Sequence, residues 1–199
     1  AYSLSADPNA ALDEVDRLLM AAREKYTPGY LRKTAELVPS VWNAFEQRRK
    51  SGKDPHALRT GFTDLDRVLG GGLHPGDLAY VAGRPGMGKT ALLANIAANV
   101  AIRQDQPVLF ASLEQPPEQL VGRLFCAESL VNTTDFGLGR ADETSLKKLE
   151  SSKRILSEAS LFWLGRIKNV GELASRARML KARHGLRLIC FDYVQRISK

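Results

Sequence analysis

The sequence GRPGMGKT, at residues 83–90, decides the fold. It satisfies the pattern GxxxxGK[ST], in which glycines let a loop wrap around phosphate oxygens just before a helix begins. An apolar run over residues 78–82 predicts the strand that should precede this loop, and the Ala- and Leu-rich residues 89–103 predict the helix that should follow it. A chain of this length matches the pattern by accident on the order of once in a hundred. We therefore interpret it as a P-loop that binds a nucleoside triphosphate.

The residue types of this loop predict ATP and Mg²⁺ as its ligands. Backbone N–H groups should converge on the phosphates, Lys89 should reach the β- and γ-phosphates, and the Thr90 hydroxyl should bind the metal ion. The predicted nucleotide-binding residues are Gly83, Arg84, Pro85, Gly86, Met87, Gly88, Lys89 and Thr90.

Two carboxylates follow predicted strands. Asp192 ends the apolar run 188–192 and is the expected second metal-site residue, although an aspartate that caps a turn is the alternative. Glu114 follows the predicted strand 108–113. Because the carboxyl ends of parallel strands open onto one ligand crevice, Glu114 is the candidate general base. On the residues alone, a solvated loop glutamate is almost equally favoured.

The elements around the P-loop alternate between strands and helices. We expect helices near residues 117–130 and 143–158, a strand over 161–164, a helix over 170–184 closed by Gly185, and a strand over 188–192. This order predicts an α/β fold with a mostly parallel sheet covered by helices on both faces.

The residues ahead of this pattern predict a separate helical segment. Asp7 can cap a first amphipathic helix, a second helix is expected over residues 39–50, and residues 51–60 are a polar linker. We expect a linker and subunit-docking segment over 1–58 and an ATPase domain over 59–199.

The composition argues against a membrane-spanning, a secreted and a disulfide- or zinc-stabilised protein. No apolar run approaches the roughly 18 residues of a transmembrane helix, and the N-terminus lacks signal-peptide features, so a cytoplasmic protein without membrane partners is expected. Cys126 and Cys190 lie in apolar stretches without CxxC spacing, which predicts buried thiols rather than a disulfide or zinc site.

The positive charge lies towards the C-terminus. Residues 140–199 contain 14 Lys and Arg against 6 Asp and Glu, whereas residues 1–139 contain 15 against 16. Four basic side chains at helical spacing could face DNA, an adjacent subunit or water, and the sequence leaves these alternatives open. They are Arg176, Arg178, Lys181 and Arg183.

Several short motifs together resemble one family. They are Thr60-Gly61-Phe62, Leu65-Asp66 and glycines 70–72 before the P-loop, then Ser112-Leu113-Glu114, Arg123 with Cys126-Ala127-Glu128, and Asp192-Tyr193-Val194-Gln195. The motifs before the P-loop are widespread in RecA-like ATPases, while the later ones are selective. Over about residues 60–198 the chain resembles the DnaB-type replicative helicases, whose motor is a RecA-like ATPase.

The resemblance implies roles for individual residues. Glu114 takes the role of the catalytic glutamate, Asp192 that of the Mg²⁺-coordinating aspartate, and Gln195 that of the residue that senses the γ-phosphate and couples it to DNA-binding loops. Lys89 joins Glu114 and Gln195 as a catalytic residue. The segment before the motor is similar to the family's linker, whose helix packs against the neighbouring subunit of a ring.

The implied function is ATP-driven translocation on single-stranded DNA with unwinding at the replication fork. The implied partners are single-stranded DNA, further copies of the chain in a hexameric ring, a primase and a helicase loader. The alternative is another RecA-like ATPase, either a recombinase or a regulatory ATPase of the KaiC kind, and the combination Ser-Leu-Glu with Asp-Tyr-Val-Gln favours the helicase. A non-enzymatic paralogue is disfavoured because Glu114 and Asp192 are both present.

The sequence departs from the family pattern at three points. Gln115 stands where methionine is usual, and Val194 stands where leucine is usual. The family also continues through further strands, DNA-contacting loops and an arginine finger, a group worth roughly 10³ to 10⁵ in rate in P-loop enzymes. We therefore expect the chain to be a fragment with little ATPase activity of its own.

Overall fold

The computed structural model describes residues 17, 33–52, 54, 56–165, 167 and 169–192 of the 199-residue chain. The chain divides into two compact units, Ala1–Pro55 and His56–Lys199. The first predicted helix, which Asp7 would cap, lies outside the described residues, and so does Gln195.

The first unit contains helix α2, Thr34–Ser51. It ends as predicted, because Gly52 adopts the left-handed conformation with φ 66° and donates its N–H to the Arg48 carbonyl over 2.8 Å. The predicted start at residue 39 is wrong, since Pro39 lies inside the helix. The missing N–H of Pro39 removes one backbone hydrogen bond near the start of the helix, and the residues before it extend the helix by more than a turn, with Glu36 near its positive end.

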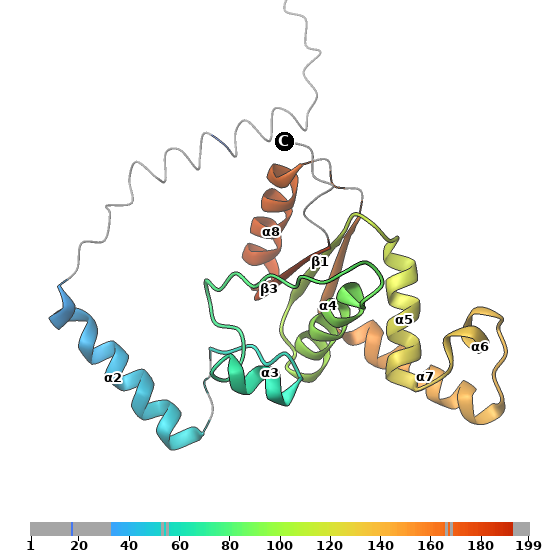
Figure 1. Ribbon diagram of the computed structural model, residues 1–199, viewed down its shortest axis with the longest axis horizontal. Helices are drawn as coiled ribbons and strands as arrows, with labels where there is room; N and C mark the ends of the chain where they lie inside the picture. Colours follow the sequence, from blue (N-terminus) through green and yellow to red (C-terminus); the bar gives the residue numbers. More distant parts are fainter. Residues whose placement is uncertain are drawn as a thin grey trace, which may run out of the picture. The chain divides into compact units, whose positions relative to one another are not determined.

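The second unit is built on a parallel sheet of three strands (Figure 1). The strands are β1 (Val108–Ser112), β2 (Leu161–Gly165) and β3 (Leu188–Asp192), in the order β2-β1-β3. In the register, Val108 of the central strand pairs with Leu161 on one side and Leu188 on the other. The three strands predicted at these positions are confirmed to within one residue at each end.

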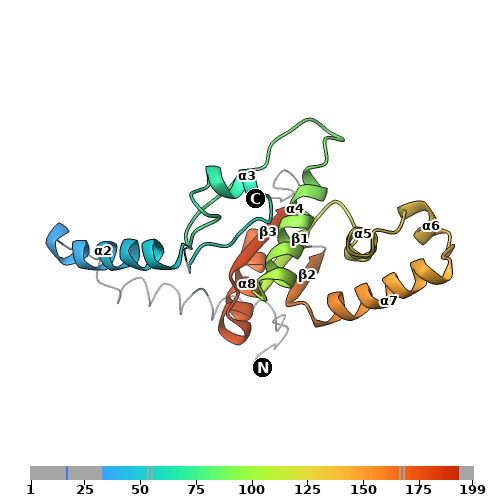
Figure 2. The same ribbon diagram turned by 90° about the horizontal axis from the view of Figure 1, so that it is seen from below.

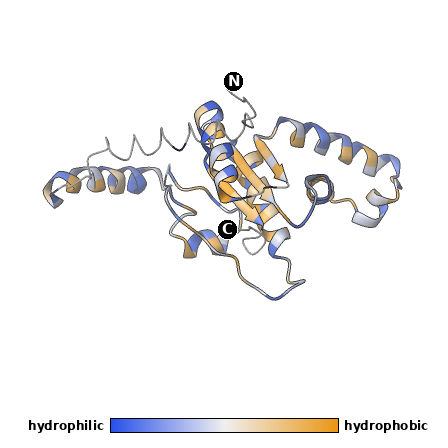
Figure 3. Cartoon of the chain, turned by 90° about the horizontal axis from the view of Figure 1, so that it is seen from above, coloured by the Kyte–Doolittle hydropathy of each residue, from blue (hydrophilic) through white to orange (hydrophobic). Residues whose placement is uncertain are grey.

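Alternate residues of the central strand pack in two different hydrophobic clusters. Helices lie on both faces of the sheet (Figure 2). Val108 and Phe110 pack in a core that contains residues of α4 (Lys89–Ala98) and α5 (Pro117–Ser129). Leu109 packs with residues of α8 (Val170–His184) on the other face. Figure 3 shows the strands as the apolar centre between more polar helices. The predicted α/β fold, with a parallel sheet covered on both faces, is confirmed.

The helices follow the prediction with local differences. α4 continues as a π-helical turn, η1 (Asn99–Arg103), so the helical stretch spans the predicted residues. α7 (Glu143–Glu158) has the predicted bounds, and α8 ends at Gly185, whose φ is 71°. Two short helices, α3 (Thr63–Val68) and α6 (Thr133–Gly137), were not predicted because neither is long enough to show an apolar period.

The strand predicted over residues 78–82 is absent. This segment contains Leu78 and Tyr80, each 77% exposed, and it forms no backbone hydrogen bond with any other described residue. A strand exists only when a neighbour pairs with it, and an apolar run cannot show whether such a neighbour is available. The segment therefore enters the P-loop as an unpaired stretch of chain.

The first residues of the second unit are fastened to the end of the helix that follows the P-loop. The Gln104 amide accepts from the Arg59 N–H over 3.0 Å and donates to the Arg59 carbonyl over 2.8 Å. Asn99 Nδ2 donates to the Thr60 carbonyl over 2.9 Å. Asp66 Oδ1 accepts from both the N–H and the hydroxyl of the buried Thr60. The threonine and aspartate of the motif before the P-loop thus hold backbone in place.

Both cysteines are free and buried, as predicted. Burial raises the pKa of the Cys190 thiol to about 12. Cys190 therefore stays protonated at neutral pH. None of the described helices has the combined length and apolarity that crossing a bilayer requires.

Candidate functional site

The P-loop at residues 83–90 is an exposed turn that leads directly into α4. Gly86 and Gly88 have φ values of 78° and 83°, a conformation that side-chain-bearing residues rarely adopt. Gly88 is the N-cap residue, and Lys89 and Thr90 are the first two residues of the helix. The first backbone N–H groups of a helix have no partner within it, so this end of α4 can donate to an anion.

Lys89 reaches back over the loop that precedes it. Its Nζ donates to the carbonyl of Gly83 over 2.9 Å and to that of Arg84 over 3.0 Å. An ammonium group has three donors, so these two bonds leave one for a further acceptor. The side chain holds the loop closed and keeps its charge beside the turn where a phosphate is expected.

Thr90 and Asp192 meet although 102 residues separate them in the sequence. The Thr90 hydroxyl donates to Asp192 Oδ2 over 2.7 Å, and Asp192 is only 6% exposed at the end of β3. Two oxygens bound to one octahedral Mg²⁺ at about 2.0–2.1 Å lie roughly 2.9 Å apart when they are adjacent ligands. The two side chains are therefore close enough to serve one ion.

The donor set fits magnesium. A hydroxyl and a carboxylate are hard oxygen ligands, and Mg²⁺ in phosphate-transfer sites binds one or two such groups together with waters and phosphate oxygens. No group of three or more His, Cys, Asp or Glu able to hold a metal occurs in the described part of the chain. This arrangement suits a metal ion that arrives with a phosphate ligand.

Glu114 lies at the same edge of the sheet as Asp192. Ser112 pairs with Asp192 in the register, and the Leu113 N–H donates to the Asp192 carbonyl over 2.8 Å. Glu114 follows directly and is exposed. The structure thus brings the predicted residues Lys89, Thr90 and Asp192 to one end of the sheet, with Glu114 beside Asp192.

Gln115 carries a buried polar atom that lacks a hydrogen-bond partner among the described residues. Its Oε1 is buried and forms no hydrogen bond within the described part of the chain. An unsatisfied buried acceptor costs about 1–3 kcal/mol, because water can no longer hydrate it. Position 115 is also one of the departures from the family pattern, where methionine is usual.

The variant Gln115→Met should therefore raise the free energy of unfolding by about 1 kcal/mol, since it removes the unpaired amide at similar volume. Urea denaturation measures this change. Gln119→Met, at an exposed position of α5, is the matched control and should leave stability within about 0.5 kcal/mol of the parent. Equal stability of the Gln115 variant and the parent would contradict the prediction.

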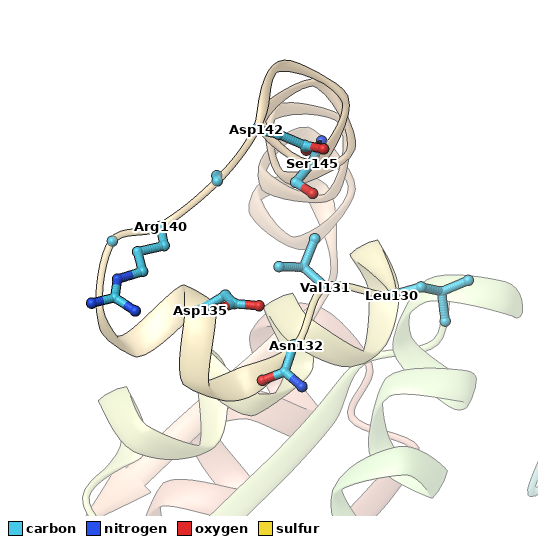
Figure 4. A pocket seen from close by; sticks show the side chains of 9 residues that line it. Leu130, Val131, Asn132, Asp135, Arg140, Asp142 and Ser145 are labelled. Carbon is cyan, nitrogen blue, oxygen red and sulfur yellow. Dashed lines mark hydrogen bonds between the residues drawn. The ribbon is translucent and has the colours of Figure 1, made fainter.

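A hollow between the end of α5, α6 and the start of α7 is not part of this site (Figure 4). Two of its polar side chains act as helix caps, since Asn132 accepts from the Thr134 N–H and Asp142 accepts from the Ser145 N–H, each over 2.7 Å. Hydrogen bonds from the Ser145 hydroxyl and backbone N–H lower the pKa of the Asp142 carboxyl. No residue of the P-loop lines the hollow, and Asn132 and Asp142 there serve to start helices.

The basic residues of α8 lie on its exposed side. Arg176, Arg178 and Arg183 are exposed, whereas Ala177 and Leu180 pack against the sheet. Lys181 Nζ donates to the Leu186 carbonyl over 3.1 Å. These basic side chains therefore form an exposed positive surface on the side of α8 that faces away from the sheet.

Solved structures share this fold. One of them, described as an ATPase domain, superposes with a TM-score of 0.72 at 24% identity, over 81% of this chain and 58% of that one. A DnaB-like replicative helicase whose structure describes its interactions with primase superposes with a TM-score of 0.71 at 24% identity, over 93% of this chain and 44% of that one. The expected RecA-like fold is confirmed.

Curated proteins are similar along nearly the whole chain. The replicative DNA helicase DnaB of Geobacillus stearothermophilus is 32% identical over 198 residues, which make up 99% of this chain and 43% of the relative. The replicative DNA helicase DnaC of Bacillus subtilis (strain 168) is 32% identical over 202 residues, with the same two coverages. The chain spans less than half the length of these relatives.

The family comparison agrees with the motifs. The DnaB-like helicase C terminal domain matches residues 57–199, which is most of the chain and all but the first residue of the second unit. The predicted resemblance to the DnaB family is confirmed. The chain therefore belongs to the DnaB-like helicases, and its residues 57–199 correspond to their C-terminal domain family.

Proposed function

We propose that the protein is the ATP-driven motor of a replicative DNA helicase, which hydrolyses ATP to move along single-stranded DNA and separate the duplex at the fork. The observation that carries the proposal is the 2.7 Å hydrogen bond between Thr90 and Asp192, which joins the P-loop helix to the end of β3. It creates a pair of oxygen ligands beside a loop suited to phosphate. The similarity to replicative DNA helicases supports the helicase part of the proposal.

In this proposal, the residues divide the work of phosphoryl transfer among them. The N–H groups of residues 83–90 and the Lys89 ammonium would bind and orient the phosphates, while Thr90 and Asp192 would hold Mg²⁺. The metal ion, when bound, supplies positive charge that stabilises the transferring phosphoryl group. Glu114 would accept a proton from the attacking water, and Gln195 would report the state of the γ-phosphate.

The relatives also guide the proposal on assembly. A solved DnaB-like relative is described with its interactions with primase, so a primase is a proposed partner, together with a helicase loader. We further propose a hexameric ring in which the linker helix packs against a neighbouring subunit, and a location in the cytoplasm. The replicative helicases among the relatives favour this function over a recombinase or a KaiC-like ATPase.

The test is strand separation by the complete protein in its natural assembly. A forked DNA substrate should be unwound only with ATP and Mg²⁺, and single-stranded DNA should raise the rate of ATP turnover. Replacement of ATP by ADP is the matched control and should stop unwinding. Steady ATP turnover that DNA does not change, without strand separation, would overturn the helicase proposal in favour of another RecA-like ATPase.

A further inference from the structure

We propose that Ser112 is a positioning residue for hydrolysis, because its hydroxyl closes the turn that carries Glu114. The inference rests on the proposed role of Glu114 as general base. Ser112 takes no direct part in the proposed hydrolysis and has no expected contact with the nucleotide. Its evidence is the hydrogen bonding of the backbone on both sides of Glu114.

The Ser112 hydroxyl satisfies both backbone groups of one residue. Ser112 is the last residue of β1 and only 2% exposed. Its Oγ donates to the Gln115 carbonyl over 2.7 Å and accepts from the Gln115 N–H over 3.2 Å. A single side chain therefore fixes where the backbone goes after Glu114.

Glu114 depends on this support, because its own side chain has none within the described part of the chain. The carboxylate is exposed and forms no hydrogen bond or ion pair there. On its N-terminal side, the Leu113 N–H is bonded to the Asp192 carbonyl over 2.8 Å. On its C-terminal side, the bonds to Ser112 hold Gln115. These two backbone anchors thus set where the Glu114 backbone lies relative to Asp192.

The second anchor is the weaker one, since it consists of one side chain rather than a sheet ladder. Pro116 and Pro117 follow at once and lead into α5, so the chain after the turn has limited freedom to compensate. A displacement of about 1 Å in a catalytic group can cost on the order of 100-fold in rate. Loss of the Ser112 hydroxyl should therefore lower the rate of hydrolysis, because it allows Glu114 to move.

The variant Ser112→Ala should lower kcat for ATP hydrolysis by about 10- to 100-fold. The affinity for ATP should remain within about twofold, because the hydrogen bonds of the Ser112 hydroxyl go to Gln115 and not to the P-loop. Ser112→Thr keeps the hydroxyl and should recover most of the lost kcat. The assay uses the complete protein in its natural assembly, with nucleotide affinity measured separately by titration with a fluorescent ATP analogue.

Ser152→Ala is the matched control for loss of a buried serine. Ser152 is also 2% exposed and its hydroxyl donates to the Lys148 carbonyl over 3.0 Å, but it lies within α7. Thermal unfolding of both alanine variants shows how much stability each loses. A kcat loss confined to Ser112→Ala supports the positioning role, while equal kcat losses in the two variants would overturn it.

A double variant separates this inference from the proposed function. Ser112→Ala should cause no further loss of kcat in the Glu114→Gln background, because the group it positions is already gone. Independent, multiplying losses would show a general structural effect and overturn the inference. If Ser112→Ala retains parental turnover while Glu114→Gln loses it, the inference fails and the proposed function stands. If Glu114→Gln itself retains turnover, the role of Glu114 fails first.

Discussion

Replacing Lys89 by alanine should reduce ATP turnover to background. A charge-assisted hydrogen bond to a phosphate is worth about 1.5–3 kcal/mol, so the affinity for ATP should fall by roughly 10- to 150-fold. The loop should also lose its internal brace, because the same ammonium bonds the carbonyls of Gly83 and Arg84. Turnover at saturating ATP and a binding titration measure the two effects separately.

The control for this variant is Lys153→Ala, which removes one positive charge from an exposed position of α7. It should leave affinity and turnover at parental values. Tight ATP binding and normal turnover in the Lys89 variant would mean that residues 83–90 do not act as a P-loop, and the helicase proposal would lose its chemical basis.

Glu114→Gln should lower turnover by about 10²- to 10⁴-fold while ATP still binds. The amide has nearly the shape of the carboxylate but cannot take a proton from the attacking water, and general-base catalysis contributes about 10²- to 10⁴-fold. The P-loop and the Thr90–Asp192 pair are untouched, so nucleotide affinity should stay within about twofold of the parent. Single-turnover hydrolysis beside equilibrium binding is the measurement.

Glu118→Gln is a charge-matched control in the same part of the chain, because Glu118 is an exposed residue in the first turn of α5. It should hydrolyse ATP at the parental rate. Parental turnover in the Glu114 variant would assign the role of general base to another group.

The sequence predicted the elements that depend on local pattern. Continuous apolar runs predicted all three strands, because both faces of a parallel sheet are buried. Gly185 predicted the end of α8, since the left-handed conformation there suits glycine. The motif GxxxxGK[ST] and an aspartate at a strand end also predicted which residues would gather at the edge of the sheet, and Thr90 does contact Asp192.

Features that depend on a pairing partner or on the local course of the chain were not predictable in this way. The apolar run 78–82 has the composition of a strand, but no described strand pairs with it. The residues of the run cannot show whether such a neighbour exists. The two hydrogen bonds of Ser112 depend on the direction that the chain takes after β1. A serine at the end of a strand does not by itself reveal that direction. The predicted start of α2 at residue 39 comes five residues too late, because the helix accommodates Pro39 in its interior.

The clasp between Arg59 and Gln104 has a mechanical consequence. The two hydrogen bonds between Arg59 and Gln104, together with the bond from Asn99 to Thr60, attach the start of the second unit to the C-terminal end of the α4–η1 helical stretch. The N-terminal residue of the same stretch is Lys89. A displacement of the backbone at Arg59 must either break these hydrogen bonds or move the helix together with its N-terminal end at Lys89. The position of the backbone at Arg59 and the position of the loop at residues 83–88 are thereby coupled through α4 and η1.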